Sequence, residues 1–347
     1  MPSFTIPLLL FLLACIGTFL STPFLFNRLR RRGIVGRDMN KSNEPEIPEM
    51  GGIGIWLGFA LGVLLAIFLD TYLQLTHLDL TLFLAGMLTI TIVAFIGIVD
   101  DLIGWRKGLR QYQHALLPIL AALPLMAVNV TNAPFSLPLI GLLPANIGLP
   151  ILGGISFSLL YSLILVPIGV TGASNATNML AGLNGLETGL GALIIGTLFI
   201  ISVLENQIEA AILAASMTGA LLGFLVFNWF PAKVFGGDSL TLMVGATIAT
   251  ISILGNMEKI GIILMVLYFI ELVLKAKHKF QGESFGKIQS DGTLKAPEKI
   301  GSLTHIAMRS GKLREDKVVL RILVIQLFIC IMVLLLYFLN RTEVLTL

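Results

Sequence analysis

LFLAGMLTITIVAFIGIVDD, residues 82–101, is a run of eighteen uncharged residues that ends on two adjacent carboxylates. As a helix, eighteen residues rise about 27 Å, close to the roughly 30 Å thickness of the hydrocarbon core of a membrane. The stretch therefore predicts a membrane helix. Its last turn would carry Asp100 and Asp101 to the boundary between lipid and water.

The rest of the chain has the same character. Of its 347 residues 56% are hydrophobic and 12% charged, and the mean hydropathy of +0.93 lies outside the range of soluble domains. Runs long enough to span a membrane begin near residues 4, 50, 81, 112, 155, 187, 210, 239, 258 and 318. We therefore expect an all-α integral membrane protein with about ten transmembrane helices, forming one domain over 1–347.

Two features of the apolar runs exclude other interpretations. The first run, roughly 4–26, is too long for the core of a signal peptide and lacks a basic segment before it, so we expect a retained span. Both cysteines lie inside apolar runs, which argues against a disulfide framework or a thiolate metal site.

The basic residues predict the orientation. If the loops alternate between sides, 21 of the 23 Lys and Arg residues fall on one side, as expected for a cytoplasmic face. This bias predicts an even number of spans with both termini outside. It also predicts affinity for anionic lipid headgroups and, where the cations converge, for anionic substrates.

The longest basic loop, 275–317, precedes the last span. Its sequence FGKIQSDGTLKA alternates around Asp291-Gly292, which is a hairpin signature. We expect a small structured cytoplasmic element that contains a hairpin.

Amide side chains concentrate in GASNATNMLAGLNGLETG, residues 172–189. Asn175 and Asn178, three residues apart, share one helix face, and the glycines that follow allow a turn that brings Asn184 close to them. Amide oxygens suit Mg²⁺, and amide hydrogens donate to phosphate. The alternative is that these amides link transmembrane helices to each other.

Other polar motifs fall on the same predicted side. Adjacent carboxylates such as Asp100 and Asp101 repel unless Mg²⁺ or a basic side chain compensates, although a solvated cap at the interface is an equal alternative. In NWFPAKVFGGDS, residues 228–239, two glycines and Asp238 precede a span whose N-terminus favours an anion. Asp238 would share a metal with Asn178, or else simply cap the helix. Phe235 is placed to stack on a base.

These motifs, in their order along the chain, resemble the polyprenyl-phosphate N-acetylhexosamine-1-phosphate transferases. The segments that carry the resemblance are GRDMNK…IPEMGG, DDLIGWR, NATNMLAGLNGLE, NWFPAKVFGGDS and KHK…SLTH, and they cover nearly the whole chain. NMLAGLNGLE and the spacing DMNK…IPE are most similar to the eukaryotic and archaeal branch. That branch transfers GlcNAc-1-phosphate from UDP-GlcNAc to dolichyl-type phosphate.

The resemblance implies a role for each matching residue. Asn178 and Asp238 would bind Mg²⁺, with Mn²⁺ as a substitute, and Asp100 or Asp101 would orient or deprotonate the acceptor. The nucleotide pocket would comprise Gly182 and Phe235 on either side of the uracil, Asn184 on the uridine, and Arg37, Asp38, Met39 and Glu49 around it. Thr171 to Met179, with Asn175, would line the path of the lipid phosphate, and Lys277, His278 and Lys279 would hold the sugar and diphosphate.

The chain departs from the family pattern at two places. Lys277 and Lys279 stand where the family often has arginines, and lysine cannot make planar bidentate contacts. The family's lysine after the aspartate pair has His114 in its slot by spacing, while Lys107 and Arg110 are the cations nearby.

The expected function is therefore Mg²⁺-dependent transfer of GlcNAc-1-phosphate from UDP-GlcNAc to a polyprenyl phosphate, the first lipid-linked step of N-glycan or related glycan assembly. The expected partners are these two substrates and membrane lipids, without nucleic acid, and a homodimer stays open. We expect a cytoplasmic active site in an archaeal plasma membrane, or in the endoplasmic reticulum if the source is eukaryotic. The alternatives are another UDP-N-acetylhexosamine donor, or a transporter or flippase of an anionic metabolite, which would need polar residues throughout the depth of the bilayer.

Overall fold

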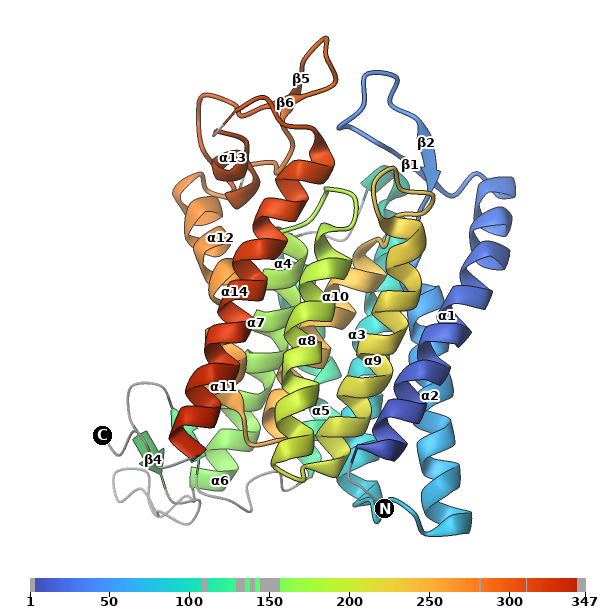
Figure 1. Ribbon diagram of the computed structural model, residues 1–347, viewed down its shortest axis with the longest axis vertical. Coiled ribbons are helices and arrows are strands. Elements are labelled where there is room, and N and C mark those ends of the chain that lie inside the picture. The colour runs from blue at the N-terminus through green and yellow to red at the C-terminus, as the bar shows by residue number, and fades with distance from the viewer. Residues whose placement is uncertain are drawn as a thin grey trace.

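The computed structural model describes residues 4–107, 111–128, 135–137, 141–143, 157–280, 282–309 and 311–341. Most of them are helical, and the long helices run roughly along the length of the molecule (Figure 1). The helices are α1 (Thr5–Arg31), α2 (Gly52–Leu73), α3 (Leu80–Lys107), α4 (Gln111–Ala121), α5 (Leu123–Ala127), α6 (Phe157–Leu160), the π-helix η2 (Tyr161–Leu165), α7 (Val166–Met179), α8 (Leu186–Leu204), α9 (Ile208–Asn228), α10 (Asp238–Leu254), α11 (Glu258–Leu264), α12 (Val266–Lys277), α13 (Leu303–Met308) and α14 (Glu315–Arg341). The short antiparallel strand pairs are β1 (Val35–Arg37) with β2 (Glu46–Pro48), β3 (Phe135–Leu137) with β4 (Gly141–Leu143), and β5 (Lys287–Ile288) with β6 (Leu294–Lys295).

Within the described ranges, seven helical segments are long and apolar enough to cross a membrane. They are Thr5–Arg31, Gly52–Leu73, Leu80–Ile103, Ser158–Met179, Leu186–Leu204, Ile208–Asn228 and Glu315–Arg341. The expected all-α multi-pass membrane architecture is therefore present. The other three apolar runs of the sequence form shorter or interrupted helices, namely α4 with α5, α10, and α11 with α12. The first of these breaks lies beside Pro124, whose ring cannot continue a helix.

The core lies around α8, α9 and α10. Every residue of α10 from Ser239 to Ile253 is buried. By contrast, only 22% of the apolar window of α1 and of α14 is buried, as expected for outer helices that face lipid.

Small residues let the backbones of α1 and α9 touch. A Cβ atom at Gly219 would lie 2.1 Å from the carbonyl oxygen of Phe11, and one at Gly223 would lie 2.4 Å from that of Cys15. Two glycines four residues apart on one face are the usual means of bringing membrane helices this close. This contact fixes the N-terminal helix, and with it the β1–β2 segment that follows.

The two ends of the molecule differ. The start of α1 and the end of α14 both lie at the lower end in Figure 1, whereas β1–β2, β5–β6 and α13 lie at the upper end. The upper end thus carries the loops that the charge bias placed on one side. Strands β5 and β6 pair Lys287 with Lys295 and Ile288 with Leu294, around Asp291-Gly292.

Candidate active site

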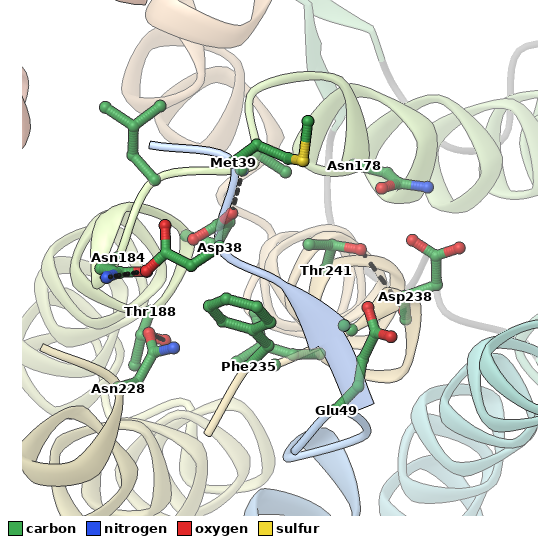
Figure 2. A pocket seen from close by; sticks show the side chains of 18 of the residues that line it. Asp38, Met39, Glu49, Asn178, Asn184, Thr188, Asn228, Phe235, Asp238 and Thr241 are labelled. Carbon is green, nitrogen blue, oxygen red and sulfur yellow. Dashed lines mark hydrogen bonds between the residues drawn. The ribbon is translucent and has the colours of Figure 1, made fainter. Parts of the chain in front are cut away.

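A polar cavity of about 250 Å³ opens at the upper end of the helices (Figure 2). Its walls come from the β1–β2 segment, the end of α7, the α7–α8 turn, the α9–α10 segment and one residue of the loop before α13. The lining residues are Gly36, Arg37, Asp38, Met39, Glu49, Asn178, Ala181, Gly182, Leu183, Asn184, Glu187, Thr188, Asn228, Phe235, Gly236, Gly237, Asp238, Leu240, Thr241 and Phe285.

Nine residues that the sequence predicted for the site line this cavity together. They are Arg37, Asp38, Met39, Glu49, Asn178, Gly182, Asn184, Phe235 and Asp238. Sequence reasoning missed Gly36, Glu187, Thr188, Asn228 and Phe285. Glu187 and Asn228 lie inside GASNATNMLAGLNGLETG and NWFPAKVFGGDS, so their place in these motifs could have identified them as site residues. Phe285 carried no signal beyond its place in the basic loop.

The other predicted residues lie elsewhere. Thr171 and Asn175 are on α7 outside the cavity lining, and the Asn175 amide donates to the Thr171 carbonyl oxygen at 2.8 Å. Lys277 and Lys279 are exposed at the end of α12. The side chains of Lys107 and His114, and the whole of Arg110, fall outside the described residues.

Backbone hydrogen bonds hold the α9–α10 segment against the start of α2. The Phe235 N–H donates to Pro48 O at 2.8 Å, the Gly51 N–H to Phe235 O at 2.8 Å, and the Gly52 N–H to Gly236 O at 2.9 Å. The approach requires glycine, because a Cβ atom at Gly51 would lie 2.7 Å from Phe235 O. These bonds fix the Phe235 ring in the cavity, where Figure 2 shows it between Asp38 and Glu49.

Asp101 caps the start of α10 from the neighbouring helix α3. Its carboxylate accepts the Asp238 N–H at 2.7 Å and the Ser239 N–H at 3.1 Å. Gly237 permits this contact, since its φ is +72° and an added Cβ would lie 2.5 Å from Asp101 Oδ2. Asp101 therefore satisfies N–H groups that a helix start leaves without intrahelical partners, and it holds Asp238 in place.

Acidic groups gather on one side of the cavity. Glu49 and Asp238 line the cavity; Asp100, which is 2% exposed and does not line it, contacts the carboxyl group of Asp238. Figure 2 shows Glu49 beside Asp238, and Asn178 pointing into the same part of the cavity. Burial raises the pKa of Glu49. Adjacent carboxylates with little solvent repel each other, so this side of the cavity favours a bound proton or a cation.

A buried polar network joins three distant parts of the chain. The Asn184 side chain donates to the Asp38 carboxylate at 3.1 Å, and the Asn184 N–H donates to Glu315 Oε1 at 2.7 Å. Lys41 forms ion pairs with Asp38 and, at 3.6 Å, with Glu315. The network fixes the β1–β2 loop and the α7–α8 turn to the start of α14.

The α7–α8 turn presents backbone to the cavity. Gly182 has a φ of +108°, which suits glycine, and its N–H donates to the Glu187 carboxylate. The ring of Phe285 lies against Gly182, where an added Cβ would be 2.9 Å from Phe285 Cε1. The cavity thus has an aromatic ring at Phe235 and a second one at Phe285.

A second cavity, of about 560 Å³, shares Met39 and Phe285 with the first. Its other lining residues are His278, Gly282, Glu283, Gly286, Lys287, Pro297, Lys299, Gly301 and His305. His278 Nε2 donates to Ile300 O at 3.0 Å. The second cavity is thus lined by imidazole and ammonium groups and by the Glu283 carboxylate, and it borders the acidic one.

His305 supports this second cavity as a neutral ring. Its Nδ1 accepts the Gly301 N–H at 3.2 Å and its Nε2 donates to Phe285 O at 3.0 Å, so the two contacts define one tautomer. Burial lowers the pKa of His305, which agrees with a neutral ring. The contact to Phe285 holds the backbone of the aromatic residue that borders both cavities.

A buried ion pair anchors the loop that forms the second cavity. Glu271 Oε2 accepts the Leu303 N–H at 2.7 Å and the Ser302 hydroxyl at 3.1 Å, and Glu271 Oε1 lies 3.7 Å from Lys275 Nζ. Lys275 also donates to Ser284 Oγ at 3.1 Å. Both ends of the loop between α12 and α13 are therefore tied to α12.

Comparison with known proteins shows one family. Residues 82–256 match the profile of glycosyl transferase family 4. The chain is 36% identical over 305 residues to a protein of Saccharolobus solfataricus provisionally named UDP-N-acetylglucosamine–dolichyl-phosphate N-acetylglucosaminephosphotransferase, covering 87% of this chain and 88% of that protein. A protein of Sulfolobus acidocaldarius with the same provisional name is 36% identical over 317 residues, 91% of each chain. The phospho-N-acetylmuramoyl-pentapeptide-transferase of Halalkalibacterium halodurans is 34% identical over 257 residues, 72% of this chain and 74% of that protein.

Proposed function

Because the chain belongs to glycosyl transferase family 4, we propose that this phosphotransferase moves N-acetylglucosamine 1-phosphate from UDP-N-acetylglucosamine to a dolichyl-type polyprenyl phosphate. The products are N-acetylglucosaminyl-diphospho-polyprenol and UMP. One observation carries the proposal: oxygen ligands for a metal and an aromatic ring for a base line a single cavity at the end of the membrane helices.

In the proposed reaction, an oxygen of the lipid monophosphate attacks the β-phosphorus of the nucleotide sugar. The bond from that phosphorus to the bridging oxygen breaks, and UMP leaves with the electron pair. The second pKa of a phosphate monoester is about 6, so the acceptor is largely ionised near neutral pH and needs no strong base. We assign removal of the residual proton to Asp100, whose carboxyl contacts that of Asp238. Asp101 positions Asp238.

The residues fit one Mg²⁺ or Mn²⁺ ion, which Asn178 and Asp238 would hold. Both side chains end in hard oxygen atoms, and the Asp100–Asp238 contact is a repulsion that a cation would relieve. Among the described residues, no group of three or more His, Cys, Asp or Glu side chains forms a metal centre. Mg²⁺ is commonly bound by one or two carboxylates together with substrate phosphates and water. When bound, the ion would offset negative charge on the diphosphate.

An apolar groove supports a lipid acceptor. A cavity of about 330 Å³ lies between η2, α7, α10, α11 and α12, and its lining includes Gly172 and Ala176 of α7. Two residues after Ala176, Asn178 lines the polar cavity. Helix α7 therefore has one face on an apolar groove and its end at the polar site, as an acceptor with a hydrocarbon tail and a phosphate head requires.

We further propose ten membrane crossings with the polar cavity on the cytoplasmic side. Seven crossings would place the start of α1 and the end of α14 on opposite sides of the membrane, but both lie at the lower end of the molecule (Figure 1). Crossings by α4 with α5, by α10, and by α11 with α12 make the number even. The basic loops then share the cytoplasmic side with the cavity. The two archaeal relatives favour an archaeal plasma membrane.

The deciding experiment identifies the lipid product. Purified protein is incubated with Mg²⁺, polyprenyl phosphate and either UDP-N-acetylglucosamine, UDP-N-acetylgalactosamine or UDP-N-acetylmuramoyl-pentapeptide, and the lipid is identified by mass. We expect a product from UDP-N-acetylglucosamine alone, absent in Asn178→Ala and Asp238→Ala. Exposed Asn27→Ala and Glu298→Ala serve as matched controls. A product from another donor would change the proposed specificity, and normal turnover in both cavity variants would remove the metal assignment.

A further inference from the structure

A groove at the cytoplasmic end of α14 combines apolar walls with two cations. It has a volume of about 670 Å³ and lies between α12, α13 and α14, which are neighbours in Figure 1. Its lining residues are Leu267, Leu303, Ile306, Ala307, Leu313, Lys317, Leu320, Arg321, Ile322, Val324 and Ile325. It shares no residue with the polar cavity or with the apolar groove beside α7.

The charges in the groove have one sign. Lys317 and Arg321 stand four residues apart on α14, so they lie one above the other on the same face. No described lining residue is a carboxylate. The two acidic residues nearest in sequence have other partners. Asp316 forms an ion pair with Arg314 at 3.1 Å, and Glu315 accepts the Asn184 N–H. The groove is therefore complementary to an anion.

The apolar wall begins between the two cations, at Leu320, and continues past Arg321 to Val324 and Ile325. Along α14 the groove runs from Lys317 to Ile325, about 12 Å at the helical rise. Leu320, Val324 and Ile325 are 44%, 55% and 51% exposed, so this wall is open to lipid. The depth suits a phosphate at the membrane boundary with the first part of its hydrocarbon chains below it.

We propose that this groove binds one anionic phospholipid of the cytoplasmic leaflet, with its phosphate on Lys317 and Arg321 and a chain along Leu320 and Val324. Arg321 already donates to Ala307 O at 3.1 Å. Arg321 thus links α14 to α13, and a phosphate on Arg321 would lie beside this contact. The site is independent of the proposed reaction, because it uses none of the residues of the polar cavity.

The test measures lipid binding, without turnover. Delipidated protein is mixed with phosphatidylglycerol and phosphatidylcholine in equal amounts, and bound lipids are counted by native mass spectrometry. We expect the wild type to retain phosphatidylglycerol selectively. A basic residue at a membrane surface contributes about 1 kcal/mol, or about 5-fold in affinity, so Lys317→Ala should weaken binding about 5-fold and Lys317→Ala/Arg321→Ala about 25-fold. Lys317 is exposed, so its replacement leaves the fold intact.

Two further variants distinguish binding in the groove from non-specific attraction of anionic lipid to exposed basic residues. Arg31→Ala removes an exposed cation at the end of α1, which lies outside the groove. This variant should leave the selectivity for phosphatidylglycerol unchanged. Val324→Trp fills the groove while keeping both cations, and should abolish retention of the lipid.

Several outcomes would overturn the proposal. These are equal retention of the two lipids by the wild type, unchanged selectivity in the double variant, or an equal loss in Arg31→Ala. Displacement of phosphatidylglycerol by polyprenyl phosphate would assign the groove to the acceptor instead. A dimer in the delipidated protein that Val324→Trp dissociates would assign it to a second copy of the chain.

Discussion

Replacing Asp101 by alanine tests whether this carboxylate builds the site by holding α10. The change removes an acceptor from two N–H groups, those of Asp238 and Ser239, at 2.7 and 3.1 Å. Each hydrogen bond to a charged acceptor contributes about 1.5 to 3 kcal/mol, and loss of a helix cap costs about 0.5 to 2 kcal/mol. Because water can hydrogen-bond to the two N–H groups and restore part of this energy, we expect the free energy of unfolding to fall by about 2 to 4 kcal/mol.

The same change should weaken binding of the proposed Mg²⁺ ion. Asp238 would lose its fixed position, and a displacement of about 1 Å at a reacting centre can cost about 100-fold in rate. Two measurements are needed for Asp101→Ala: thermal unfolding in detergent, and the Mg²⁺ concentration for half-maximal formation of lipid-linked sugar. Asp101→Asn, which keeps one acceptor oxygen, should be intermediate in both. Asp238→Ala should lose activity at every Mg²⁺ concentration but unfold near the wild-type temperature.

Gly237→Ala provides an independent check on the same contact. Its new Cβ would lie 2.5 Å from Asp101 Oδ2, and the φ of +72° disfavours alanine, so it should impair Mg²⁺ dependence much as Asp101→Ala does and stability at least as much. Since both changes break one contact, the double variant should lose less than the sum of the single losses. If Asp101→Ala unfolds like the wild type and needs no more Mg²⁺, or if the two losses simply add, the positioning role of Asp101 is refuted.

Three further predictions concern the surrounding structure. Asn184→Ala removes one hydrogen-bond donor from the buried Asp38 carboxylate, so we expect the free energy of unfolding to fall by about 1 to 3 kcal/mol. UDP should also raise the unfolding temperature less than in the wild type. An equal rise would contradict a role of the network in the site. Glu271→Ala leaves Lys275 without its ion pair and frees the start of α13, so limited proteolysis should cut the loop between α12 and α14 faster than in the wild type, and an unchanged rate would contradict the anchor. Burial raises the pKa of Glu49, so the folded state binds its proton more tightly than the unfolded state. In chelator, the unfolding temperature should therefore fall as pH rises through that titration, and an equally steep fall in Glu49→Gln would argue against this assignment.

Hydrophobic run length was enough to locate the helices, because a membrane allows few alternatives to a helix of fixed length. All ten predicted runs contain helix in the described residues. Run length could not show which runs are continuous. The break at Met265, between α11 and α12, interrupts an apolar stretch that has no proline or glycine at that point.

Motif reading located most of the cavity lining, but it could not assign geometry within it. Asp100 and Asp101 are neighbours in sequence, yet one carboxyl contacts that of Asp238 and the other caps α10. The difference depends on how closely α3 and α10 pack, and a Cβ at Gly97 would lie 2.5 Å from Asp238 O. Packing between distant helices leaves no local pattern that separates two adjacent aspartates.

The contact between Asn184 and Glu315 has a consequence for synthesis of the protein. Glu315 is the first residue of α14, the last long helix to be made, while its partners Asn184 and Lys41 are made much earlier. Until α14 is made, Lys41 can pair with Asp38 but lacks its second carboxylate, that of Glu315. A chain that ends before α14 would therefore contain the earlier helices but lack the Glu315 carboxylate that links the β1–β2 loop to the α7–α8 turn, and we expect such fragments to bind UDP more weakly even when they insert correctly.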